Sequence, residues 1–211
     1  MGDKAWKEGE RQVARHMGNL WGVKFYRSEG SGSVATLRQN SLPESVVHAL
    51  TGDVICDPYD SALHPTIKFP FSIEVKTRKD PIDVFEICRQ GKKSELFQWW
   101  QQASRDAMRV RKLPLLWIKV IRRQWYVGMD TRLLEMICSQ EDYFPEVANS
   151  KTINGLMDCA WHARWEIADG HWLKMSVLTS DFFLTIGREG LEKAALELVL
   201  PIYDWNPKEQ T

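Results

Sequence analysis

The sequence predicts a mixed α/β fold, a central sheet flanked by helices, and three observations support this class. Residues 71–78 alternate between apolar and polar side chains, which is the period of a half-buried strand. Residues 94–112 carry apolar side chains at helical spacing and lead into residues 115–121, a nearly continuous apolar run that is typical of a strand buried on both faces. A further helical stripe, at residues 3–21, precedes these elements.

The helix predicted at residues 3–21 has an acidic side chain inside its apolar stripe. At steps of four and three residues the stripe contains Trp6, Glu10, Val13, Met17 and Leu20. Glu10 should therefore face the interior, where a carboxylate needs a cation or a raised pKa. The cation is either an internal arginine or lysine or a metal ion, and the metal site expected nearby favours the metal.

Two short strands and a polar loop are predicted after this helix. Gly22 ends the helix, residues 23–27 form a strand, and residues 52–56 form a second strand that begins with a carboxylate. The Ser- and Gly-rich turn at residues 28–33 is either a plain connector or a surface that approaches phosphates, because small side chains expose backbone amides. Arg38, in the continuation of this loop, is a candidate phosphate contact.

The strand at residues 71–78 contains the pair of charges around which a site is predicted. Alternation places Glu74 and Lys76 on the same face of this strand. If the strand at residues 52–56 is its neighbour, Asp53 converges with them on one point.

The helix predicted at residues 94–112 has two distinct faces. Its apolar face packs on the sheet, and the opposite face presents Gln98, Gln102, Arg105 and Arg109. Amides and guanidiniums suit phosphates and sugar edges, although a solvated helix face has the same pattern. The following strand should pair with residues 124–129 as a hairpin, which completes a core over residues 1–130.

Residues 131–211 are predicted to form a C-terminal α+β extension that packs on this core. The patterns indicate a short helix at residues 130–138, a pair of strands at 159–167 and 172–179, and a closing helix at 190–200. The role of this extension is open, and an elaboration of the core or a layer for dimerisation or regulation would both fit.

Composition narrows the class of protein. The net charge is zero, but residues 1–123 carry 21 Lys and Arg against 14 Asp and Glu, whereas residues 124–211 carry 7 against 14. A basic half that holds the candidate site suits a polyanionic substrate. No apolar run is long enough to cross a membrane, no signal peptide is recognisable, and the four cysteines form no CxxC pair, so we expect a cytoplasmic protein with free thiols.

The convergent charges favour the hydrolysis of a phosphodiester. This reaction needs an activated water and stabilisation of charge on the phosphoryl oxygens, which a hard divalent cation on oxygen ligands can supply. Asp53, Glu74 and the Val75 carbonyl would bind the ion, and Glu10 would complete the shell directly or through water. Lys76 would orient the water or neutralise the phosphate. Mg²⁺ is the expected ion, and Mn²⁺ should substitute for it.

An Asp followed at a distance by Glu-x-Lys on an apolar strand resembles the PD-(D/E)xK nuclease superfamily. The order of five segments is similar to that in archaeal-type Holliday junction resolvases: residues 9–15, 25–27, 31–33, 52–55 and 73–76. The resemblance covers residues 7–121 and implies a restriction-endonuclease-like core, a metal pair at Asp53 and Glu74, a catalytic Lys76 and a helical Glu10. It also implies DNA contacts at Arg27, Ser31 and Ser33, and a homodimer that cuts four-way DNA junctions.

Departures from that pattern keep the alternatives open. Gly52 stands where the superfamily name has proline, the connecting segments look longer than in compact archaeal enzymes, and the C-terminal part is extra. We therefore expect a Mg²⁺-dependent DNA endonuclease, with branched DNA as one possible substrate. A restriction- or repair-type nuclease acting on duplex or nicked DNA is the alternative enzyme. A non-catalytic DNA-binding module on a nuclease fold is disfavoured, since it would not need the three convergent charges.

Overall fold

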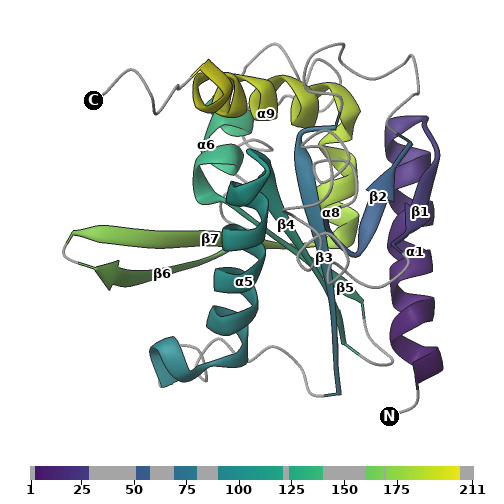
Figure 1. Cartoon of the computed structure of the whole chain (residues 1–211), viewed down its shortest axis with the longest axis horizontal. Coiled ribbons are helices and arrows are strands. Elements are labelled where there is room, and N and C mark those ends of the chain that lie inside the picture. Colours follow the sequence, from purple (N-terminus) through teal and green to yellow (C-terminus); the bar gives the residue numbers. More distant parts are fainter. Residues whose placement is uncertain are drawn as a thin grey trace, which may run out of the picture.

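A computed structural model describes residues 3–28, 51–57, 69–79, 90–120, 124–139, 160–168 and 170–204 of the chain. Within these residues, seven strands form one sheet in the order β1-β2-β3-β4-β5-β7-β6 (Figure 1). The strands are β1 (Phe25–Arg27), β2 (Val54–Cys56), β3 (Phe71–Arg78), β4 (Leu113–Val120), β5 (Trp125–Met129), β6 (Trp161–Ala168) and β7 (His171–Thr179). The mixed α/β class predicted from the sequence is confirmed.

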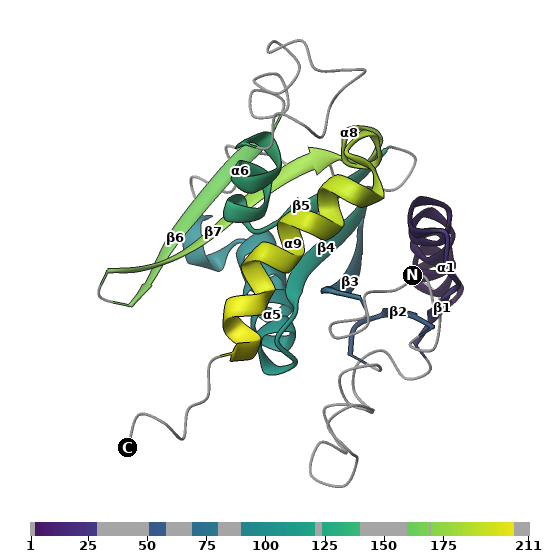
Figure 2. The ribbon, with the colours of Figure 1, turned by 90° about the horizontal axis from the view of Figure 1, so that it is seen from above.

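Helices cover both faces of the sheet. They are α1 (Asp3–Trp21), the 3-10 turn η1 (Gly91–Lys93), α5 (Glu95–Arg109), α6 (Thr131–Ser139), α8 (Ser180–Thr185) and α9 (Gly187–Asp204). Buried side chains of α1, α6, α8 and α9 form a hydrophobic core on one face of the sheet, whereas α5 packs on the opposite face (Figure 2). Among the described residues, no helix is long and apolar enough to cross a bilayer.

The centre of the sheet is a parallel pair. β3 and β4 pair from Phe71↔Leu113 to Arg78↔Val120, and α5 connects them, because parallel neighbours need a crossover. Every residue of β4 except Lys119 is buried, so the prediction of a strand covered on both faces is confirmed. β5 then pairs with β4 in the antiparallel direction, as the predicted hairpin required.

Local sequence signals set the ends of the two longest helices near the site. α1 spans the predicted residues, buries Val13, Met17 and Trp21 completely, and ends at Gly22, whose φ of 70° is a left-handed conformation that glycine adopts without strain. α5 begins after Ser94, whose side chain accepts a hydrogen bond from the Phe97 N–H at 3.2 Å.

The C-terminal strands continue the same sheet. β7 pairs with β5 from Tyr126↔Thr179 to Met129↔Ser176, and β6 pairs with β7 to close the predicted strand pair. The sheet therefore runs across residue 130, where the sequence suggested the end of the core. Figures 1 and 2 show the β6–β7 hairpin reaching well beyond the helices that cover the centre of the sheet.

Candidate active site

The candidate site lies where β2 separates from β3. These strands pair at Val54↔Ile73, and the Asp53 N–H donates to the Ile73 carbonyl at 2.7 Å. The next donor along β3, the Val75 N–H, is bound at 2.8 Å by Asp53 Oδ2. The Asp53 carboxylate thus accepts a hydrogen bond that a backbone carbonyl of a paired strand would otherwise accept. This contact holds Asp53 against the strand that contains Glu74.

Gly52 allows this close approach. Its φ is 106°, and a Cβ added to it would lie 2.7 Å from the Ile73 carbonyl oxygen and 3.0 Å from the Ile73 nitrogen. Both the conformation and the contact exclude a side chain. In the sequence, Gly52 is a departure from the proline of the superfamily name, whereas the structure requires glycine at this position.

Glu74 and Lys76 lie on the face predicted for them and meet a third side chain. Lys76 Nζ donates to Glu74 Oε1 at 2.6 Å and to Gln102 Oε1 at 3.3 Å, and Gln102 Nε2 donates to Glu74 Oε1 at 3.1 Å. One amide on α5 therefore holds both charged groups. The sequence assigned Gln102 to DNA contact, and its only signal for a place in the site was its position on the polar face of the helix.

The electrostatics of Asp53 favour the binding of a cation beside it. Its side chain is buried, and burial followed by the charge of Glu74 raises the pKa of its carboxyl from 3.8 to about 7. The charge of Glu10 acts in the same direction, whereas the Val75 N–H and Lys76 oppose the shift. A buried carboxylate that repels its acidic neighbours is favoured as an anion when a cation binds beside it.

Glu10 is buried, as the apolar stripe predicted, and its partner is an arginine. Glu10 Oε2 accepts a short hydrogen bond from Arg27 Nε, and the Arg27 guanidinium lies 5.0 Å from the Trp6 ring centroid. Burial raises the pKa of Glu10, and Arg27 opposes this shift. The structure thus contains the internal ion pair, the alternative that the sequence left open, and most of the Arg27 side chain is engaged inside the protein.

Two carboxylates and a backbone oxygen are the donors available to a metal ion. No group of three or more His, Cys, Asp or Glu side chains in the described ranges is arranged to hold one. Asp53 and Glu74 are hard oxygen donors close enough to interact electrostatically. The Val75 carbonyl points toward the β2 side of β3, as the Val75 N–H does, because the N–H and C=O of one strand residue point the same way. This donor set fits a hard divalent cation.

The remaining predicted DNA contacts are away from these groups or outside the described residues. Gln98 Nε2 donates to the Lys93 carbonyl at 3.4 Å, and Arg105 Nε lies 3.7 Å from Asp106 Oδ1 on the exposed side of α5. Ser31, Ser33 and Arg38 lie outside the described residues.

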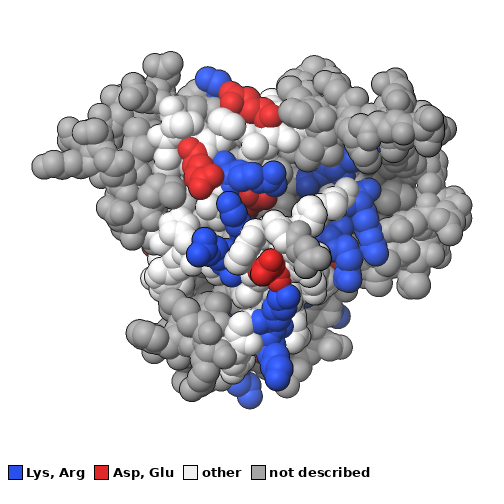
Figure 3. All heavy atoms as spheres, turned by 90° about the vertical axis from the view of Figure 1, so that its left-hand side faces the viewer, with Lys and Arg blue, Asp and Glu red and all other residues white. Residues whose placement is uncertain are grey.

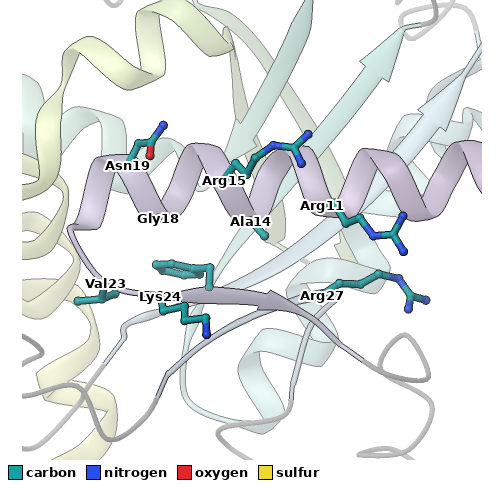
Figure 4. Close-up of a pocket in the computed structure, with 9 residues that line it drawn as sticks. Arg11, Ala14, Arg15, Gly18, Asn19, Val23, Lys24 and Arg27 are labelled. Atoms are coloured by element: carbon teal, nitrogen blue, oxygen red, sulfur yellow. The ribbon is translucent and has the colours of Figure 1, made fainter.

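A cationic groove between α1 and β1 was missed by the sequence reasoning. It has a volume of about 360 Å³ and is lined by Arg11, Ala14, Arg15, Gly18, Asn19, Val23, Lys24, Phe25 and Arg27. Figure 4 shows Arg11 and Arg27 extending toward the same end of the groove, one from the helix and one from the strand. The carboxylate of Glu8, on the same helix, lies 3.0 Å from Arg15 Nη2 and 3.7 Å from Arg11 Nη1. The sequence pattern that could have predicted this groove is the pair Arg11 and Arg15, which lie one helical turn apart.

The fold and this site define a nuclease of the PD-(D/E)xK class, and comparison with known proteins agrees. A family model described as "Phage putative PDDEXK endonuclease" matches residues 7–159, so the chain belongs to that family. Over 125 residues, 59% of this chain and 68% of the relative, the chain is 29% identical to Protein D14 of Escherichia phage T5. No solved structure matches the chain. The likeness to archaeal-type resolvases stays a prediction.

Proposed function

We propose that this nuclease is a divalent-metal-dependent DNA endonuclease with Asp53, Glu74 and Lys76 at its centre. The observation that supports this most directly is the convergence of these groups where β2 leaves β3. Burying two interacting carboxylates costs stability, and the fold uses Gly52 and the Val75 N–H to keep one of them in place. Such an arrangement is typical of sites selected for chemistry rather than for stability.

Asp53, Glu74 and the Val75 carbonyl would hold a Mg²⁺ ion, which Mn²⁺ could replace. When bound, such an ion lowers the pKa of a water molecule and offsets charge on the phosphoryl oxygens. Glu10 contributes negative charge near Asp53, while its own carboxylate stays bound to Arg27. We therefore assign Glu10 an electrostatic and positioning role. Its contact with the ion would be through a water molecule rather than direct.

Lys76 is the group that meets the substrate phosphate or the attacking water. Its ammonium is held by Glu74 and Gln102, so it can present a remaining proton to an oxygen without first becoming ordered. Gln102 is a positioning residue, since its amide donates to Glu74 and accepts from Lys76.

DNA is the proposed substrate because a cationic groove adjoins this site. The groove between α1 and β1 adjoins it through Arg27, whose Nε contacts Glu10. Figure 3 views the molecule from the side where the β6–β7 hairpin projects, at the other edge of the sheet from this site, and there too Lys and Arg cover more of the described surface than Asp and Glu. Phosphate contacts from such side chains make binding steeply dependent on salt.

We further propose branched DNA, in particular a four-way junction, as the preferred substrate. The support is the order of the motifs along the chain, which is similar to that in archaeal-type resolvases. Two linked copies of the site would be needed to cut opposed strands, and a homodimer would supply them.

The test is a cleavage panel of four-way junction, flap, nicked duplex and linear duplex, each with Mg²⁺, with Mn²⁺ and with a chelator. We expect metal-dependent cleavage that Glu74→Ala abolishes, while binding to the same DNA survives. Glu189→Ala, which removes an exposed carboxylate on α9, is the matched control and should cleave normally. Full activity in Glu74→Ala would contradict the site, and equal cutting of all four substrates would contradict the preference for junctions.

A further inference from the structure

The far edge of the sheet, formed by β6, is exposed along most of its length. Among the described residues β6 pairs with β7 alone, and Trp165 is the one buried side chain of the strand. Trp161 and Ile167 are 37% and 47% exposed. An open edge strand with exposed apolar side chains is a template for pairing with another strand.

Two like charges lie directly opposite each other across β6 and β7. Arg164 lies directly opposite Lys174 of β7, and like charges at opposed positions destabilise a strand pair. Glu166 lies opposite Trp172, and its Oε1 accepts a hydrogen bond from the Gly170 N–H at 3.2 Å. Arg164 therefore faces Lys174 directly, and the favourable partner that β7 gives it is an aromatic ring, because its guanidinium lies 5.3 Å from the Trp172 ring centroid.

We propose that two copies of this chain associate through antiparallel pairing of their β6 strands about a two-fold axis at Trp165. In this register Arg164 of each copy lies opposite Glu166 of the other. Both charge pairs form at once because a two-fold interface presents the same surface twice. Each pair offsets the repulsion between Arg164 and Lys174.

The surroundings of β6 leave room for this arrangement. The hairpin projects from the body of the protein (Figure 1), so its edge is accessible beyond the flanking helices. A hollow of about 590 Å³ beside β6 is lined by Gly91, Lys92 and residues 164–168, and it leaves space for side chains of the second copy. The bulge between Glu166 and Ala168 confines regular pairing to the strand centre, so we expect a dimer in concentration-dependent equilibrium with monomer.

The β6 dimer would be the homodimer on which the proposed junction cleavage rests, and the two proposals can fail separately because association is measured without DNA or metal. The surface also lies outside the residues matched by the family model, which end at residue 159. A dimer formed here would place two copies of the nuclease site in one particle, which paired incisions require.

The experiment is a charge exchange on the full chain, followed by sedimentation velocity over a range of concentrations. Arg164→Glu and Glu166→Arg each place like charges opposite one another and should weaken self-association by about tenfold or more. The double variant R164E/E166R restores opposite charges and should recover the dimer. An equimolar mixture of the two single variants should form a heterodimer, although neither variant associates with itself.

Arg132→Glu is the matched control, since it makes the same charge change at an exposed site on α6 and should leave the dimer intact. Thermal melting would verify that each variant folds, which we expect because the substituted side chains are exposed. A wild-type chain that stays monomeric, a dimer insensitive to both single changes, or a double variant that fails to recover association would each overturn the proposal.

Discussion

The two edges of the sheet use charged residues in opposite ways. At the β1–β2–β3 edge, Glu10 and Asp53 are buried, and the strands separate so that a carboxylate binds a backbone N–H. At the β6–β7 edge, Arg164 and Glu166 are exposed on a projecting hairpin. Buried charges are expensive to maintain and can be expected to serve chemistry, whereas exposed charges cost little and are better suited to choosing a partner.

Removing the charge of Asp53 should have the largest effect. Asp53→Asn keeps an oxygen for the Val75 N–H but loses a ligand charge, so cleavage should fall by more than about 100-fold. Because the folded-state pKa of about 7 lies above the ordinary value of 3.8, the folded metal-free protein holds the extra proton between those values, and its stability falls as pH rises through that window.

The same substitution should therefore stabilise the metal-free protein above pH 7, by about 1–3 kcal/mol. Urea unfolding at pH 5 and pH 8 measures this, and the gain should be small at the lower pH. A variant that is less stable than the parent at pH 8 would show that Asp53 is retained for structure.

Gly52 and Gly170 both have a positive φ and lie at opposite edges of the sheet. Comparing their alanine variants separates the effect of a steric clash from the effect of backbone strain. Gly52→Ala and Gly170→Ala both impose a left-handed conformation on alanine, at about 1–2 kcal/mol. Only Gly52→Ala also places a Cβ 2.7 Å from the Ile73 carbonyl oxygen, while a Cβ at Gly170 meets nothing within 4 Å. We expect Gly52→Ala to lose most cleavage and more stability, and Gly170→Ala to cleave normally; equal losses in chemical unfolding would refute this distinction.

Truncating Gln102 should give an intermediate effect. Gln102→Ala removes the amide that holds Glu74 and Lys76, and we expect kcat to fall about 10- to 100-fold with little change in DNA affinity. Gln98→Ala, one turn earlier on the same face of α5, is the control. The loss in Gln102→Ala should fall on kcat, whereas weakened DNA binding with an unchanged kcat would return Gln102 to the role of a DNA contact.

The smallest effect is expected at a buried charge that the proposed chemistry does not use. Burial lowers the pKa of Lys112 from 10.5 to about 8, and its ammonium lies 5.9 Å from the Phe69 ring centroid. The unfolded chain holds more protons between these pH values, so the penalty is complete below pH 8 and declines as pH rises toward 10.5. Lys112→Met should stabilise the protein at pH 7 by about 1–3 kcal/mol without altering cleavage, as measured by urea unfolding.

Local patterns were enough to predict the elements that form the site. Periodicity predicted α1 and β3 at their observed boundaries, and alternation placed Glu74 and Lys76 on one face. These features depend on neighbours within a few residues, which the sequence displays directly. The burial of Glu10 could be predicted for the same reason, but Arg27 could not be chosen as its partner, because the pair joins two elements across the packing of a helix on a strand.

The sequence by itself determined the class of fold, the pair of charges on β3 and the basic character of the N-terminal half. Only the tertiary structure decided that Gly52 must be glycine, that Gln102 contacts Glu74 and Lys76, and that β7 joins β5 so that β6 becomes the far edge of the same sheet. Each of these depends on the register between segments distant in the chain, and register is set by packing over the whole core rather than by local periodicity.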